Sequence, residues 1–269
     1  MVSQAGACRG RTCHRVTARR YPALHRLRIG CVQYLNSRPL ICDYDGPVVF
    51  KHPSALAEML FADELDVALV PVFEALRHPG YQLVDGAAIA SDGPVFSVFL
   101  AHHGALSGIR KVALDPASLS SAHLLRVMLA EFHDLHPEYG GEGDARLLIG
   151  NQAIDFRMDP ANADWEILDL GEEWKRCTGL PFVFALWAMR SGVSPAVADE
   201  LRALKERGIQ HIPEIVDSDD FSTHEIRHCY LNEHIHFDVG ERGKTAIERY
   251  RALLVKHGLI PDSGPVCFC

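Results

Sequence analysis

Mostly apolar segments recur along the first third of the chain, and polar segments separate them. The segments at 27–32, 65–70 and 81–90 predict strands, and the one at 65–70 resembles the largely apolar strands that are covered on both faces in parallel sheets. Helices are expected between them, at 55–62, where Pro53 lies near the first turn, and at 73–77. This alternation of strand and helix indicates a parallel sheet that is covered by helices.

A second unit of the same kind follows in the middle of the chain. Strands are expected at 95–102, 111–114, 146–149 and 165–168, together with an amphipathic helix at 121–133. After a strand at 182–189 the pattern turns helical, at 195–207, 213–216, 223–232 and 241–257. The strands at 95–102 and 182–189 are the natural crossings between two α/β lobes. We expect one lobe over 27–100 and 185–269, the other over 101–184, and a cleft between them.

Three stretches join an apolar strand to a polar turn of Asn, Ser, Gly and Pro. They lie at 28–40, 91–100 and 178–187. Strand ends that lead into small, donor-rich turns are where open α/β sheets hold anionic ligands. Asp92 is the only Asp, Glu or His in these three stretches. The pattern therefore predicts an anion site built from neutral donors.

Charge is distributed unevenly along the 269 residues. The net charge is −8, but residues 1–28 hold seven Arg and no acid, so the remainder carries 20 basic and 35 acidic side chains. Such an acidic body is unsuited to nucleic acid, and no apolar run approaches the ~18 residues of a membrane span. Residues 1–26 are expected to form a disordered basic extension without a secretory signal. With eight scattered Cys and no Cys-x-x-Cys pair, the sequence indicates a reducing, cytoplasmic setting. A monomer or homodimer is expected.

His224-Glu225-Ile226-Arg227-His228 fits the H-E-x-x-H signature of zinc proteases. His234 lies ten residues after His224, where one subclass has its third ligand, but Leu231 stands where that subclass needs Gly. The segment also lies near the C-terminus, with little sheet beside it to form a substrate cleft. A His-rich surface helix is the better interpretation, and no metal site is predicted.

Six motifs along the chain occur together in one order. The first three are Ile-Gly-x-Val-x-Tyr-Leu-Asn-x-x-Pro-Leu at 29–40, Glu-Leu-Asp-Val-Ala-Leu-Val-Pro at 64–71 and Ser-Asp-Gly-Pro-Val-x-Ser at 91–97. The others are Val-Ala-Leu-Asp-x-x-Ser at 112–118, Leu-Leu-Ile-Gly at 147–150 and the stretch 169–187. In these motifs the chain resembles the chorismate dehydratases of the futalosine route to menaquinone. The resemblance extends from about Leu27 to Ile260. It implies the two-lobed α/β fold of type II periplasmic binding proteins. It also implies dehydration of chorismate to 3-[(1-carboxyvinyl)oxy]benzoate, with neither a metal nor an organic cofactor.

By position, the resemblance implies that Asn36 and Ser97 are the catalytic pair that contacts the substrate. The residues that it places in the substrate-binding turns are Tyr34, Ser118, Ser120, Ser121, Gly150 and Asn151. The chain departs from the family pattern at Leu119, where Arg is common, and at Asn151, where Asp is usual. These departures alter the expected charge of the cleft.

The chemistry suits these residue types. Chorismate is a dianion, and the start of the helix at 121 offers free backbone N–H groups and partial positive charge. Ser118 and Ser120 either cap that helix or donate to the ligand. Asn36 is otherwise a turn-forming residue, and Ser97 is otherwise a buried strand serine that bonds to backbone.

The loss of water makes the ring aromatic, so the reaction needs only proton removal and help for the leaving group. Our hypothesis is that the substrate's own enolpyruvyl carboxylate takes the ring proton, with Asp92 as the alternative base. A non-catalytic binding protein for a small carboxylate is the alternative function, since the fold supports both.

Overall fold

The computed structural model describes residues 20–114 and 119–269. Within those ranges the strands are β1 Ile29–Cys31, β2 Val48–Phe50, β3 Val67–Pro71, β4 Gln82–Ser91, β5 Val98–His102, β6 Lys111–Ala113, β7 Glu138–Gly140, β8 Ala145–Ile149, β9 Glu166–Asp169 and β10 Phe182–Met189. The α-helices are α1 Pro53–Phe61, α2 Val72–Arg77, α3 Leu119–His133, α4 Gly150–Met158, α5 Leu170–Thr178, α6 Ala196–Gln210, α7 Ile212–Ser218, α8 His224–Cys229 and α9 Gly240–Lys256. Short 3-10 turns occupy Leu24–Arg26, Leu35–Leu40, Leu106–Gly108 and Pro160–Asn162, and a π-helical turn occupies Tyr230–His234.

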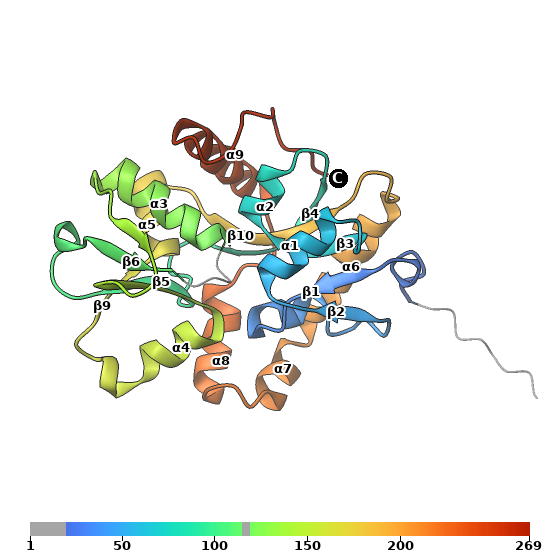
Figure 1. Ribbon diagram of the computed structural model, residues 1–269. Coiled ribbons are helices and arrows are strands. Elements are labelled where there is room, and N and C mark those ends of the chain that lie inside the picture. Colours follow the sequence, from blue (N-terminus) through green and yellow to red (C-terminus); the bar gives the residue numbers. More distant parts are fainter. Residues whose placement is uncertain (1–19, 115–118) are drawn as a thin grey trace, which may run out of the picture.

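The strands form two five-stranded sheets that lie side by side (Figure 1). The first sheet has the order β2-β1-β3-β10-β4 and the second has the order β7-β6-β8-β5-β9. Helices pack around both sheets, with α1, α2, α6 and α9 against the first and α3, α4 and α5 against the second. The predicted α/β architecture with two sheet-forming units is confirmed.

The first sheet is mixed, whereas we expected a parallel sheet. β1 pairs in parallel with β2 and β3, but β10 lies antiparallel between β3 and β4. The reason is the path of the chain. β4 leads out toward the second sheet and β10 leads back, so Phe182 pairs with Ser91 where the two strands meet. The second sheet repeats this arrangement, with β5 antiparallel between β8 and β9.

The chain crosses between the sheets at two places. Val98–Leu100 belongs to the second sheet, although we expected it in the first lobe. Phe182–Phe184 belongs to the first sheet, although we expected it in the second lobe. We therefore propose lobe borders that follow sheet membership. The first lobe ends in the turn after β4 and resumes at the start of β10.

Residues 20–26 pack against the first lobe, so this part of the expected disordered extension is ordered. Tyr21 and Leu24 are buried, because their apolar side chains join the core. The Tyr21 hydroxyl donates to Asp43 over 2.7 Å. The backbone N–H groups of Ala23 and Leu24 donate to the Glu200 carboxylate of α6.

One hydrophobic core extends through both lobes, and a smaller cluster around Phe99, Ala101 and Ala153 lies in the second. In the described part of the chain, no helix is both long and apolar enough to cross a membrane. The shared core joins the two sheets, and the cleft lies where their strand ends meet.

Candidate functional site

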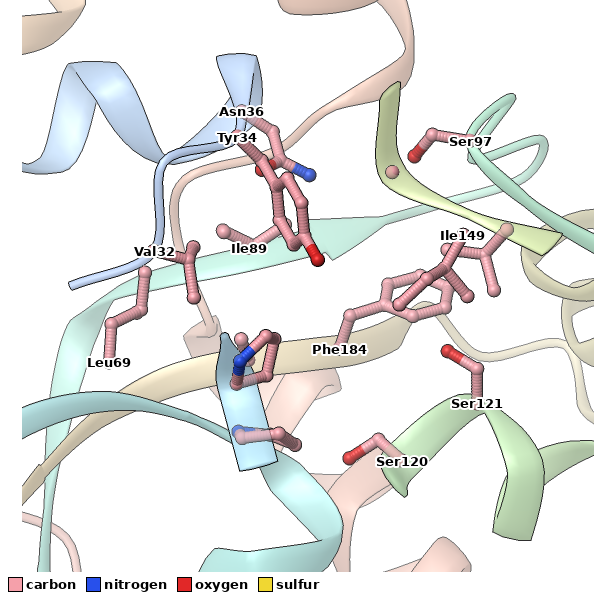
Figure 2. Close-up of a pocket in the computed structure, with 15 residues that line it drawn as sticks. Val32, Tyr34, Asn36, Leu69, Ile89, Ser97, Ser120, Ser121, Ile149 and Phe184 are labelled. Carbon is pink, nitrogen blue, oxygen red and sulfur yellow. The ribbon is translucent and has the colours of Figure 1, made fainter. Parts of the chain in front are cut away.

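A cleft lies between the two sheets and has about 580 Å³ of empty space, its open mouth included (Figure 2). The first lobe contributes mostly apolar side chains from the ends of β1, β3, β4 and β10, which are Val32, Leu69, Pro71, Ile89, Phe184 and Ala185. The polar lining comes from Tyr34, Asn36, Ser97, Ser120 and Ser121. This is a typical small-molecule site, largely apolar with a few convergent polar groups.

None of the described residues that line the cleft is an Asp, Glu, Lys, Arg or His. Three helices instead begin at its wall, since Pro53 starts α1, Ser120 and Ser121 lie in the first turn of α3, and Gly150 starts α4. The first backbone N–H groups of a helix have no partner within it, and its N-terminus carries partial positive charge. Their convergence suits a negatively charged ligand without any cationic side chain.

Asn36 and Ser97, which are far apart in sequence, are joined through a third residue, Tyr230. The Asn36 side-chain amide Nδ2 donates to the Tyr230 hydroxyl over 2.9 Å, and the Ser97 and Tyr230 hydroxyls are 2.7 Å apart. Burial raises the pKa of Tyr230 well above its ordinary value of 10.0, so its hydroxyl stays protonated near neutral pH. Tyr230 was not among the residues predicted for the site. It comes directly after α8, which carries the H-E-x-x-H segment, and no local sequence pattern marks it as a site residue.

A strained turn places Ser97 at the cleft. Phe96, the residue before it, has a φ of 67°, a left-handed conformation that is unfavourable for a bulky side chain. The buried carboxylate of Asp169 holds this turn by accepting the backbone N–H groups of Val95 and Phe96 over 3.0 and 2.8 Å. Arg157 lies 4.5 Å from the centre of the Phe96 ring and packs against its face. Ser97 is therefore fixed by the second lobe.

The two serines of α3 have different environments. The Ser120 hydroxyl accepts the backbone N–H of Phe73 in α2 over 2.8 Å, so it links the lobes rather than capping its own helix. Ser121 has no hydrogen-bond partner among the described residues, and Figure 2 shows its hydroxyl directed toward the cleft. Ser118 lies outside the described residues.

Gly150 and Tyr34 meet across the cleft. Gly150 has a φ of 63°, and a Cβ atom there would lie 3.3 Å from the Tyr34 ring. Glycine thus gives α4 its left-handed first residue and lets its N-terminus approach the ring. Asn151, the next residue, is partly exposed and is not among the residues that line the cleft.

The remaining sequence candidates lie apart from the cleft lining. Asp92 forms ion pairs with Lys175 and Arg242. In α8, His224 faces Asp217 at 3.1 Å, and its ring centre is 6.5 Å from that of His228. Over the described ranges, no three His, Cys, Asp or Glu side chains are grouped so that they could hold a metal ion.

Comparisons with known proteins agree with this geometry. A family model described as menaquinone biosynthesis matches residues 27–256. The chorismate dehydratase of Thermus thermophilus is 30% identical over 219 residues, which cover 71% of this chain and 80% of that protein. The chorismate dehydratase of Campylobacter jejuni is 26% identical over 223 residues, covering 81% and 88%.

The fold is shared with solved structures. A Candida albicans protein with the generic periplasmic binding protein fold superposes with a TM-score of 0.61 at 12% identity, over 88% of this chain and 92% of that one. This match confirms the expected two-lobed fold. Because the family model spans most of the chain, the protein belongs to the menaquinone biosynthesis family and is a relative of the chorismate dehydratases.

Proposed function

We propose that this chain is a chorismate dehydratase, which removes water from chorismate to give 3-[(1-carboxyvinyl)oxy]benzoate. The observation that carries the proposal is the cleft itself. It joins three helix N-termini to neutral side-chain donors and has no Asp, Glu, Lys, Arg or His among its described lining residues. Such a site fits a substrate that brings its own two negative charges, and the dehydratases of Thermus thermophilus and Campylobacter jejuni support the assignment.

The N-termini of α3 and α4 are the proposed carboxylate sites. Ser121 donates from the first turn of α3, and the backbone at Gly150 presents the start of α4. The apolar lining residues Ile89, Ile149 and Phe184 would pack against the carbon ring of chorismate. A dry apolar wall strengthens each of these hydrogen bonds, because little water competes for the carboxylates.

The reaction breaks two bonds on neighbouring ring carbons. The carbon that bears the enolpyruvyl ether loses its hydrogen as a proton, and the adjacent carbon loses its hydroxyl, so that one water leaves and the ring becomes aromatic. The enolpyruvyl carboxylate accepts the ring proton, because the described cleft lining offers no Asp, Glu or His as a base. It then passes this proton to the departing hydroxyl, which leaves as water. Asn36 and Ser97 donate hydrogen bonds to the departing hydroxyl or to the nearby carboxylate, and catalysis is orientation plus electrostatic stabilisation.

The test is to mix purified protein with chorismate and follow the loss of its diene absorbance, with the product identified by mass. A product lighter by one water is expected. Asn36→Ala and Ser97→Ala should each lower kcat by roughly 100- to 1000-fold, the usual effect of removing one donor to a developing charge. Chorismate that binds but is recovered unchanged would contradict the proposal and favour a non-catalytic binding protein.

We also propose a cytoplasmic setting, with the protein acting as a monomer or homodimer. The six cysteines that the structure describes are all free thiols, and Cys31 is buried in the core. Free thiols are typical of a reducing compartment. Size-exclusion chromatography with light scattering distinguishes the two oligomeric states.

A further inference from the structure

Tyr230 lies between the two residues proposed to contact the substrate, yet it does not line the cleft. Its side chain is buried, with 2% of the residue exposed. Its hydroxyl has two partners among the described residues, the Asn36 amide at 2.9 Å and the Ser97 hydroxyl at 2.7 Å. A fully buried hydroxyl must satisfy its proton within the protein. The direction of these two bonds therefore follows from counting protons.

With the Asn36 amide oriented so that Nδ2 faces Tyr230, the count gives one direction for the chain of bonds. Asn36 Nδ2 is a donor, so the Tyr230 oxygen accepts there and cannot give its proton in that direction. The Tyr230 proton then has one acceptor within reach in the described structure, the Ser97 oxygen. Because Ser97 accepts from Tyr230, its own proton is left to point elsewhere. Ser97 lines the cleft, so that proton is available to a ligand.

We infer that Tyr230 is a positioning residue that makes Ser97 a hydrogen-bond donor to the substrate. This inference rests on the proposed function and deepens it, because it sets the direction Asn36 to Tyr230 to Ser97 to ligand. Each bond in such a chain polarises the next, so the Ser97 hydroxyl becomes a stronger donor to the departing oxygen. Without the tyrosine hydroxyl, Ser97 would be free to turn its proton away from the cleft.

The local fold holds Tyr230 rigidly. It begins a π-helical turn immediately after α8, a deviation that is frequent at functional sites. Arg227 in α8 is buried, and its guanidinium donates to the backbone carbonyls of Val216, Phe221 and Ser222 over 2.7–3.0 Å. Part of the H-E-x-x-H segment thus anchors the helix that leads to Tyr230. This gives the segment a structural role.

The experiment is a double-mutant cycle on kcat and KM with chorismate. Tyr230→Phe removes only the hydroxyl and should lower kcat by roughly 10- to 100-fold with little change in KM, because the donor to the transition state is misdirected. In a Ser97→Ala background the same change should alter kcat by less than about twofold, since Tyr230 acts through Ser97. The matched control is Tyr21→Phe, which removes another buried tyrosine hydroxyl, one that donates to Asp43.

The outcomes separate this inference from the proposed function. Tyr230→Phe with wild-type kcat, or an equal loss of kcat in both backgrounds, would overturn the role of Tyr230 while leaving the dehydratase assignment intact. If the wild-type protein binds chorismate without converting it, the cycle is measured on Kd, and independent effects of the two changes would overturn the inference. Wild-type protein that neither binds nor converts chorismate would overturn both. Thermal unfolding of each variant checks that the fold is retained.

Discussion

At the residue scale, the one acid within the stretches 28–40, 91–100 and 178–187 forms ion pairs and does not line the cleft. Asp92 follows β4, where the chain leaves the first sheet, and it pairs with Lys175 of α5 and Arg242 of α9. It therefore ties elements of both lobes to the crossing between them. The hydrogen bond from Lys175 lowers the pKa of Asp92 below its ordinary value of 3.8. A carboxylate that is held charged by two cations is a weak proton acceptor, so Asp92 is a poor candidate for the base.

We therefore expect Asp92→Asn to keep kcat for chorismate within about threefold of wild type, because lost surface ion pairs have small effects. A lowered pKa means that the native state favours the charged form. Its contribution to stability is complete above pH 3.8 and is lost as the pH falls further, through the lowered pKa. Acid unfolding curves of both proteins should converge in that range. A variant that binds chorismate normally but no longer converts it would identify Asp92 as the base.

The residues named from the sequence include the polar side chains that line the cleft but not the link between Asn36 and Ser97. The family resemblance pointed to Asn36 and Ser97 by their positions in short local motifs, at 29–40 and 91–97. Tyr230 is 133 residues from Ser97, and nothing in its neighbourhood distinguishes it from a core tyrosine. Asn151 follows Gly150, which lines the cleft, but is not itself among the lining residues. Contacts that depend on packing between lobes leave no local signal.

At the element scale, the start of α4 depends on one glycine. Gly150 has positive φ, accepts no larger side chain without strain, and brings the helix N-terminus against Tyr34. Its N–H donates to the Ser97 carbonyl over 2.8 Å, which joins this helix to the turn that carries Ser97. The same residue thus sets both the direction of α4 and the distance between two walls of the cleft.

Gly150→Ala should therefore lower stability by about 1–2 kcal/mol through its left-handed backbone and also raise KM for chorismate. The matched control is Gly104→Ala. Gly104 has a similar φ of 65°, but nothing lies within 4 Å of an added Cβ atom. The control should show the loss of stability without the change in KM. Equal KM values for the two variants would mean that the approach of α4 to Tyr34 has no role in binding.

At the scale of the whole molecule, the α/β pattern predicted two sheets but not the antiparallel β10. The pattern of apolar residues predicts that Phe182–Met189 is a buried strand, but it does not indicate whether the strand runs parallel or antiparallel to its neighbours. Direction follows from the two crossings, which only the assembled topology fixes. Helix α9 packs on the first sheet and also contacts α3 of the second lobe. Tyr250 of α9 donates to the Ser120 carbonyl over 3.3 Å, next to the cleft wall.

A charged contact also joins these two helices away from the cleft. Glu131 near the end of α3 accepts from Lys256 over 2.7 Å and faces His257 at 3.0 Å. The hydrogen bond from Lys256 lowers the pKa of Glu131 below its ordinary value of 4.5. If the lobes separate to admit a ligand, this contact breaks, as in hinge closure of other two-lobed proteins. The ion pair then favours the closed form and adds to ligand affinity.

We accordingly expect Glu131→Gln to weaken chorismate binding by about two- to fivefold, since a partly exposed ion pair contributes at most about 1 kcal/mol. The difference in chorismate affinity between the variant and the wild-type protein should shrink at high salt, because salt screens the attraction that Glu131 makes in the wild-type protein. It should also vanish as the pH falls below 4.5 through the lowered pKa, where wild-type Glu131 becomes neutral. Titration calorimetry at two salt concentrations measures this, with the exposed Glu142→Gln as the matched control. A loss of affinity that does not depend on salt would instead indicate that Glu131 orders the end of α3. In that case the ion pair would not contribute to lobe closure.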